Sequence, residues 1–235
     1  MPGNVLVSTA AAVEQGPRER LLAAADALMH RRGYEAVGVA ELCAAAGTKK
    51  GSFYHFFESK QALAIEMLER AWTRTRATIF AEAFDDDSLG AVAAFTTYGA
   101  RLADYQGRFV QQEDLVPGCR FGNFAAELSG ADESMRVCIE TIFQQMTAIF
   151  EATIVRGRTR GEVPDDLDVR RVAGAVLAHM EGLMVVAKAT RNGAVLNDLG
   201  PLVARLLEGE SAPSSRKAPT RQRTLSTRYP SSSPP

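Results

Sequence analysis

Apolar residues recur at intervals of three and four along most of this 235-residue chain, and no segment shows the sustained alternation expected of a strand. This periodicity predicts an all-α fold. The first helix should begin at Pro17, which suits a first turn, and end near Arg32, because Gly33 suits a helix C-terminus. Its apolar face consists of Leu21, Leu22, Ala25, Leu28 and Met29.

Two short helices are expected next, at about 39–46 and 49–56, with Gly47 in the turn between them. A fourth helix should run over about 60–80. The hydroxyl of Ser59 is a candidate cap for its N-terminus, where it can accept a hydrogen bond from a free backbone N–H.

An acidic run at residues 85–87 predicts a solvated loop and is also the best candidate for a domain boundary. Long amphipathic patterns follow it, interrupted by Gly and Pro. The last two helices are expected at about 165–190 and 195–208. From Ser211 onward, Ser, Pro, Thr and Arg dominate and large apolar residues nearly vanish, which predicts a disordered tail.

The net charge of −1 conceals an uneven distribution of charge along the chain. Five of the 27 Lys and Arg residues lie in 211–235, which holds no acidic residue, so the remainder of the chain is acidic. An acidic body does not bind polyanions indiscriminately. Any contact with nucleic acid must therefore come from a local basic surface.

Three cysteines, an odd number, in a chain without a convincing signal peptide indicate reduced thiols and a cytoplasmic protein. No uninterrupted apolar run reaches the ~18 residues of a membrane span, so no membrane association is expected. With 46% apolar residues, the chain can build a packed core.

Residues 37–60 carry the pattern of a helix-turn-helix unit. The first short helix must pack across the second, which requires an inward apolar face, and Gly47 allows the close approach of the turn. Aromatic residues can anchor the second helix to the core. The inward residues are Val39, Leu42, Cys43 and Ala46 in the first helix and Phe53, Phe56 and Phe57 in and after the second.

The outward residues of the second helix suit contact with DNA. Basic and small polar groups can reach phosphates and base edges in the major groove, and the hydroxyl of Tyr54 can donate to a phosphate oxygen. Gly51 allows the backbone to come near the duplex. The residues concerned are Lys49, Lys50, Gly51, Ser52, Tyr54 and His55.

The run from Gly33 to Ala36, the segment VAELCAAAG and the segment KGSFYHFFESKQAL together resemble the N-terminal domain of the TetR (tetracycline-repressor) family, over about residues 17–68. The resemblance implies an all-α homodimer with a three-helix DNA-binding head and a helical body. It also implies repression at a palindromic double-stranded operator, and release from it when a small-molecule effector binds. No cofactor is implied.

Transferred residue by residue, the resemblance places Lys50, Gly51 and Ser52 in the groove. It places Tyr54, His55 and Lys60 at backbone phosphates, with a position near a base as a second option for His55. Two plainer interpretations stay open: Tyr54 as a packing aromatic and Lys60 as a solvated lysine. The chain departs from the family pattern at Val37-Gly38, where a capping hydroxyl residue is usual, so a hydroxyl contact to phosphate is lost there.

The patterns along the chain and the resemblance together predict a division into four parts. These are a flexible arm (1–16), a helix-turn-helix domain (17–62), an effector-binding and dimerisation domain (63–210) and a disordered basic tail (211–235). The tail could add non-specific affinity for phosphates or be inert.

Segment 117–128, PGCRFGNFAAEL, is the best lead to the effector, because it loosely resembles a subgroup with a cysteine-containing effector domain. Some similar regulators respond to electrophiles or acyl thioesters. Arg120 and the start of a helix should favour a Cys119 thiolate, so we hypothesise that Cys119 senses an electrophile or oxidant. The alternative is a small thiol that fills the core.

Other residues are candidates for an effector pocket. Asn123 and Glu127 lie four apart and could orient a polar ligand group, or else cap or pair locally. His179 is expected to be a hydrogen-bonded core histidine or a pocket residue. The remaining candidates, each individually a plausible core residue, are Phe95, Tyr98, Phe121, Phe143, Met146 and Met180.

The helices at 165–190 and 195–208 are the candidates for a dimer interface, because small residues there allow close helix approach. A tightly packed monomer core is the alternative. The small residues are Ala173, Gly174, Ala175, Ala178 and Gly182.

Two other functions compete with DNA binding. A Cys-dependent small-molecule enzyme would need more than a conceivable Cys119–His179 pair, and the chain lacks a phosphate-cradling loop, a His-Glu-x-x-His motif and a Gly-x-Ser-x-Gly motif. A helical protein-binding adaptor would leave the basic start of the 49–56 helix without a purpose. The sequence therefore favours a DNA-binding regulator that is not an enzyme.

Overall fold

The computed structural model describes residues 16–208, and within this range all regular structure is helical, which confirms the all-α class. The helices are α2 (Pro17–Arg32), α3 (Val39–Ala45), α4 (Lys50–Phe56), α5 (Lys60–Thr75), η1 (Arg76–Phe80), α6 (Ala81–Phe84), α7 (Ala91–Glu113), α8 (Arg120–Leu128), α9 (Glu133–Thr159), α10 (Val169–Thr190), η2 (Gly193–Asp198) and α11 (Leu199–Leu207). The tail predicted for 211–235, and all but the last residue of the arm predicted for 1–16, lie outside the described residues.

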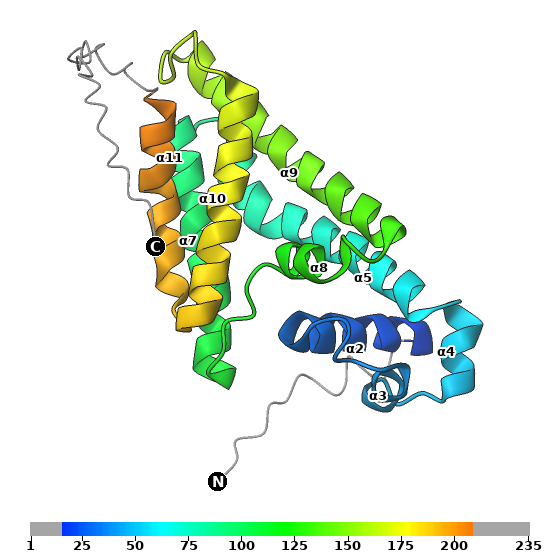
Figure 1. The fold of residues 1–235 in the computed structure, drawn as a ribbon. Coiled ribbons are helices and arrows are strands. Elements are labelled where there is room, and N and C mark those ends of the chain that lie inside the picture. The colour runs from blue at the N-terminus through cyan, green and yellow to red at the C-terminus, as the bar shows by residue number, and fades with distance from the viewer. Residues whose placement is uncertain (1–15, 209–235) are drawn as a thin grey trace, which may run out of the picture.

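Helices α2, α3 and α4 form a small head at one end of a longer helical body (Figure 1). Two glycines with positive φ close its turns: Gly33 at 89° ends α2, and Gly47 at 59° lies between α3 and α4. The Gly33 N–H donates to the Met29 carbonyl at 2.9 Å, which satisfies an otherwise free carbonyl of α2. The three helices predicted for the head are therefore confirmed, each with bounds within about a residue of the prediction.

Helix α5 leaves the head and continues into the body through η1 and α6. Ser59 caps it as predicted, since its Oγ accepts from the Ala62 N–H at 3.0 Å. The segment η1 is a π-helical turn, in which backbone hydrogen bonds join residues five apart rather than four apart as in the α-helices on either side. The predicted helix over 60–80 is thus continuous but not regular.

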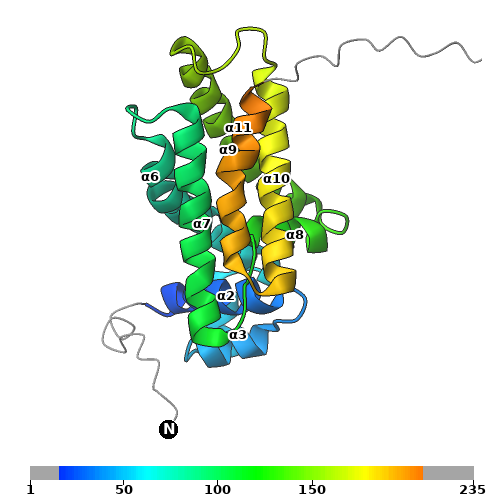
Figure 2. The ribbon, with the colours of Figure 1, turned by 90° about the vertical axis from the view of Figure 1, so that its left-hand side faces the viewer.

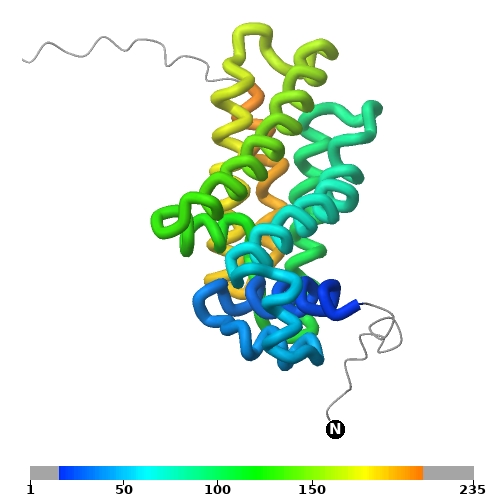
Figure 3. Tube along the Cα trace, turned by 90° about the vertical axis from the view of Figure 1, so that its right-hand side faces the viewer, coloured from blue at the N-terminus to red at the C-terminus, as the bar shows by residue number. Residues whose placement is uncertain are grey.

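The body has two layers. Figure 2 shows α7, α11 and α10 side by side along the long axis, and Figure 3, from the opposite side, shows α9 and α5 crossing that layer. Between the layers lies an aromatic cluster in which ring centroids are 4.8 to 5.9 Å apart, with tilted and edge contacts and one stacked pair, Phe80 and Phe150. Its members are Phe80, Phe84, Phe95, Tyr98 and Phe150.

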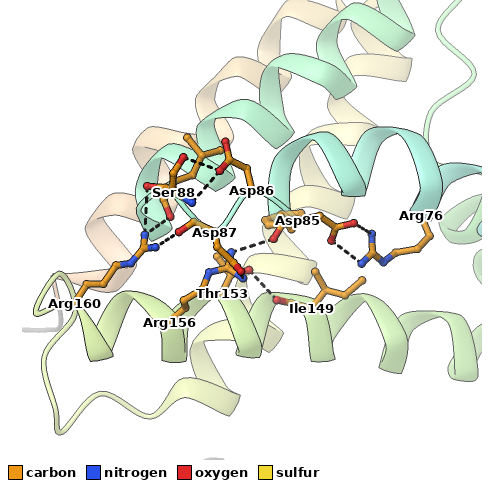
Figure 4. Close-up of polar contacts among 11 residues, drawn as sticks. Arg76, Asp85, Asp86, Asp87, Ser88, Ile149, Thr153, Arg156 and Arg160 are labelled. Carbon is orange, nitrogen blue, oxygen red and sulfur yellow. Dashed lines mark hydrogen bonds and ion pairs between the residues drawn. The ribbon is translucent and has the colours of Figure 1, made fainter.

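The acidic run at 85–87 is an anchored loop (Figure 4). Asp85 pairs with Arg76 at 2.7 Å, and Asp87 pairs with Arg156 of α9 at 3.2 Å. Arg160 donates to the Leu89 carbonyl at 2.6 Å. The loop joins α6 to α7, which pack on one another within the body. Its interpretation as a domain boundary was therefore wrong, because both of its neighbours belong to the same core.

Candidate nucleic-acid interface and cavity

Helix α4 is anchored by the aromatic residues that the sequence predicted. Phe53 is fully buried, Phe57 is nearly so, and Phe56 is half-buried. The Phe53 ring contacts those of Tyr54 and Phe57 at centroid distances of 5.1 and 5.9 Å. These contacts fix the rotation of the helix, so its opposite face points outward.

The outward face of α4 carries basic and small residues. Lys49, Lys50, Gly51 and His55 are exposed, and Ser52 is half-buried. A Cβ added at Gly51 would meet nothing within 4 Å, so this glycine leaves open space at the first turn of the helix. This face is therefore accessible to a large ligand.

Tyr54 is the most exposed aromatic residue among the described residues, with 53% of its surface accessible. An edge contact with Phe53 is the one ring contact it makes there. Exposure on this scale disfavours the interpretation of Tyr54 as a packing aromatic, since a packing ring is normally covered.

Lys60 is engaged inside the head. Its Nζ donates to the carbonyls of Tyr34 and Val37 at 3.1 and 3.2 Å and lies 3.8 Å from the centroid of the Tyr34 ring. The ammonium thus ties the start of α5 to the loop after α2. These contacts disfavour the interpretation of Lys60 as a solvated lysine, and its contact with a phosphate stays a prediction.

A cavity of about 520 Å³ lies where the head meets the body, a size typical of small-molecule sites. Head residues Asp26 and His30 of α2 line it, together with residues of α5, η1 and α7 to α10. Five of the predicted effector residues take part in its wall: Tyr98, Cys119, Phe121, Met146 and Met180.

The other five predicted effector residues lie elsewhere. Phe95 is buried in the aromatic cluster, and Phe143 lines a separate hollow formed mainly by α9. His179 is exposed on α10, where its Nδ1 lies 2.8 Å from the Ala175 carbonyl. The core interpretation of His179 was wrong, because the buried stripe of this helix is Ala173, Val176, Met180, Met184 and Ala187.

Asn123 and Glu127 bond to other parts of the protein rather than line the cavity. The Asn123 Nδ2 donates to the Pro117 carbonyl at 2.9 Å, and its Oδ1 accepts from Lys188 at 3.2 Å. The Glu127 carboxylate accepts from the backbone N–H groups of Tyr34 and Glu35 at 2.9 and 2.7 Å. Asn123 therefore bonds partly within its own segment, as the local alternative expected, whereas Glu127 does not pair locally and instead links α8 to the head.

Cys119 caps α8, with its Sγ accepting from the Gly122 N–H at 3.4 Å. Burial raises the pKa of this thiol well above its ordinary value, and the neighbouring Glu181 carboxylate acts in the same direction. Arg120, expected to favour the thiolate, points instead to α2. The expected thiolate is therefore wrong for this structure.

Arg120 belongs to a buried polar network that the sequence did not reveal. It pairs with Asp26 at 2.8 Å and donates to His30 Nδ1 at 3.1 Å, while His30 Nε2 donates to the Gly118 carbonyl at 3.1 Å. Burial, and secondly the charge of Arg120, lower the pKa of His30 to about 3, so this imidazole is neutral. Gln106 completes the network by bonding both the N–H and the carbonyl of Gly118.

The cavity wall also contains Arg74, Arg101 and Arg108, which sequence reasoning missed. These residues come from α5 and α7, and no local spacing indicates that their side chains meet at one cavity. Only the packing of α2 against α5, and of η1 against α7, brings them together.

Helix α10 leaves a stripe of small and apolar residues uncovered. A Cβ added at Gly174 or Gly182 would meet nothing within 4 Å, and Val185 is 66% exposed. Within the described residues this is the one helix long and apolar enough to cross a membrane, by length and composition alone. Its buried stripe packs on α9 and η2, as in the core helix of a folded domain.

Two family models match the chain. That of the bacterial regulatory proteins of the tetR family matches residues 21–67, and that of the tetracyclin repressor-like C-terminal domain matches residues 100–199. The first covers the head, and the second covers most of the body.

Relatives give the same assignment across both parts. The HTH-type transcriptional repressor DhaR of Mycobacterium sp. (strain GP1) is 30% identical over 175 residues, which cover 74% of this chain and 84% of DhaR. The repressor NemR of Escherichia coli (strain K12) is 30% identical over 149 residues, 62% of this chain and 70% of NemR. The crystal structure of E. coli NemR in its reduced form superposes with a TM-score of 0.69 at 26% identity, covering 80% and 94% of the two chains.

Proposed function

Because the chain belongs to the TetR family of helix-turn-helix transcriptional regulators, we propose that it contacts operator DNA through the exposed face of α4. It is a DNA-binding regulator of the repressor type. The observation that carries the residue assignment is the outward face of Lys49, Lys50, Gly51, Tyr54 and His55 above a fully buried Phe53.

Each residue on this face has a distinct role in the proposal. Lys50 and Ser52 reach the groove and Gly51 keeps the backbone close to it, while Lys49, Tyr54 and His55 meet phosphates. Lys60 acts indirectly, since its ammonium positions the loop that follows α2. Gly38 is the N-cap of α3, and no side chain caps this helix end. The proposal therefore includes no hydroxyl contact with a phosphate at this position.

Substitution of Lys50 by Ala should weaken binding to the operator roughly tenfold and reduce the salt slope of binding by about one. Fluorescence anisotropy on the DNA upstream of the protein's own gene measures both quantities. Arg136→Ala, which removes an equal charge from α9, is the matched control and should bind normally. Equal affinities for the two variants, with the fold of each intact by circular dichroism, would contradict the assignment.

We propose further that a small molecule in the cavity between head and body releases the operator. The cavity is lined by both parts of the protein, which supports this coupling, because a ligand there can favour one relative position over another. Cys119 lines the cavity, but its raised pKa favours non-covalent binding over the electrophile chemistry expected from the sequence. An acyl thioester stays a candidate as a non-covalent ligand.

We also propose that two copies associate through the uncovered stripe of α10, with α11 beside it. A dimer presents two heads, and two heads can read two half-sites of a palindrome. Its relatives are transcriptional regulators, and we propose a cytoplasmic location and no catalytic role for this chain.

A further inference from the structure

The walls of the cavity carry more positive than negative charge. Four arginines line it, Arg74, Arg101, Arg108 and Arg120, against the two carboxylates of Asp26 and Glu82. Arg101 is paired with Glu82 at 2.5 Å. Arg108 is exposed and has no ion-pair partner within residues 16–208. An uncompensated guanidinium at a cavity is suited to a carboxylate or phosphate ligand.

The other two arginines share a single carboxylate. Arg74 Nη2 lies 2.5 Å from Asp26 Oδ2, and Arg120 Nη2 lies 2.8 Å from Asp26 Oδ1. The Nε of Arg120 is buried and makes no hydrogen bond to any described residue, and neither does Asp26 Oδ1, so the contact of this oxygen with Arg120 is an ion pair without hydrogen-bond geometry. One carboxylate therefore serves two guanidinium groups, and a buried donor beside it stays unused, which is costly unless a ligand satisfies it.

The inner part of the cavity has a different chemistry. Aromatic and thioether side chains form most of it: Phe80, Phe121, Met146, Met180 and Met184. Tyr98 is 1% exposed, and no hydrogen bond within the described part of the chain occupies its hydroxyl. This end accepts an apolar group, with one hydroxyl available to it.

We infer that the effector is an amphipathic organic anion, with its carboxylate or phosphate at the arginines and its apolar part among the Phe and Met side chains. This inference rests on the proposed release of DNA from this cavity and specifies its ligand. The anion competes with Asp26 for Arg74 and Arg120. Because Asp26 belongs to α2 and Arg120 to α8, that competition separates the head from the body at one ion pair.

Ligand binding can be measured without DNA, because the single tryptophan reports on the cavity. The Trp72 ring contacts Phe80 and Phe121, both in the cavity wall, at centroid distances of 5.0 and 6.2 Å. Hexanoate and phenylbutyrate would be titrated into full-length protein, and the uncharged amide of each acid would be titrated in parallel as its control. Binding would be followed by the fluorescence emission of Trp72 and by the midpoint of thermal unfolding. We expect each acid to bind about tenfold or more tightly than its amide.

Variants test whether the arginines cause this preference. Arg108→Gln should weaken acid binding about tenfold and leave the amides unchanged, while Arg136→Gln on α9 should change neither. Equal binding of acid and amide, or no response to either acid at millimolar concentration, overturns the inference. Operator binding by the ligand-free protein is a separate measurement, so a failure here is distinct from a failure of the proposed function.

The competition with Asp26 gives a second readout. In Asp26→Asn, Arg74 and Arg120 lose their carboxylate partner, so the acid should bind this variant more tightly than the unsubstituted protein. The same acid should nevertheless change the affinity for the operator less, because no ion pair with Asp26 is left for it to break. Both effects follow from removing one competitor. Weaker acid binding, or an undiminished effect of the acid on operator affinity, excludes Asp26 as the group that the ligand displaces.

Discussion

Cys119 shows how a side chain's surroundings decide its chemistry. Its chain neighbours predicted a thiolate, since Arg120 is adjacent and a helix begins there. Cys119, however, is the extended N-cap residue of α8 and Arg120 is the first residue of the helix, so Arg120 reaches α2 while the thiol faces Glu181. Burial raises the pKa of the thiol, and the neighbouring Glu181 carboxylate raises it further.

Replacing Glu181 by Gln should therefore lower the pKa of Cys119 and accelerate its alkylation about 3- to 10-fold at neutral pH. The reaction with iodoacetamide would be followed by mass spectrometry, with Cys43→Ser and Cys138→Ser in the background to leave one thiol. In the presence of Glu181, Cys119 should react more slowly than free glutathione. A faster reaction than glutathione's would restore the electrophile-sensor hypothesis.

The residues that sequence predicted well are those whose role is local. Ser59, Gly33 and Gly47 act within one turn of helix, and Phe53 is buried because its own helix has one apolar face. The position of Arg74 at the cavity depends instead on how α5 packs against α2 and how η1 packs against α7. Phe95 is a core residue because it contacts Phe84 and Phe150. No spacing within one segment contains that information.

At the scale of elements, α8 connects the two parts of the protein. Its N-terminus lines the cavity through Cys119 and Arg120, and near its C-terminus Glu127 accepts two backbone N–H groups of the loop after α2. Nine residues thus extend from the candidate ligand site to the head. A rotation of α8 would disturb both ends at once, which gives a physical route for coupling.

Glu127→Gln should loosen this link, because an amide presents one acceptor where the carboxylate presents two. The backbone amides of Tyr34 and Glu35 should exchange with deuterium faster. The loss of one hydrogen bond should lower the free energy of local opening by roughly 0.5–1.5 kcal/mol. Glu140→Gln, on the exposed face of α9, is the control. Unchanged protection of both amides would mean that Glu127 does not hold the loop in solution.

Helix periodicity predicted the existence of nearly every element, but the assignment of faces was less complete. For α10, the predicted small residues divide between a buried position, Ala173, and exposed positions, Gly174 and Gly182. The pattern of Val176, Met180 and Met184 indicates the buried stripe, and it would have placed His179 outside. Which exposed face meets a partner is a property of two chains, and one chain's periodicity does not contain it.

For the whole molecule, the uncovered stripe of α10 makes a specific prediction about assembly. Gly182→Arg should convert a dimer into a monomer, because the arginine has open space within its own subunit but would meet the partner. Light scattering after size exclusion measures the mass, and operator binding should be lost together with the dimer. Gly182→Ala should stay dimeric and gain roughly 0.5–1 kcal/mol of helix stability. A monomeric unsubstituted protein would refute the assembly.

The π-helical turn η1 has a consequence for how this molecule can change over generations. A π turn holds one residue more than an α-helix of equal rise, so removal of one residue such as Ala77 restores regular geometry. Helices α5 and α6 would then keep their faces towards the core, while Thr78, Ile79 and Phe80 would be presented differently at the cavity. A single-codon deletion can therefore alter the choice of ligand while the scaffold that carries the head is preserved.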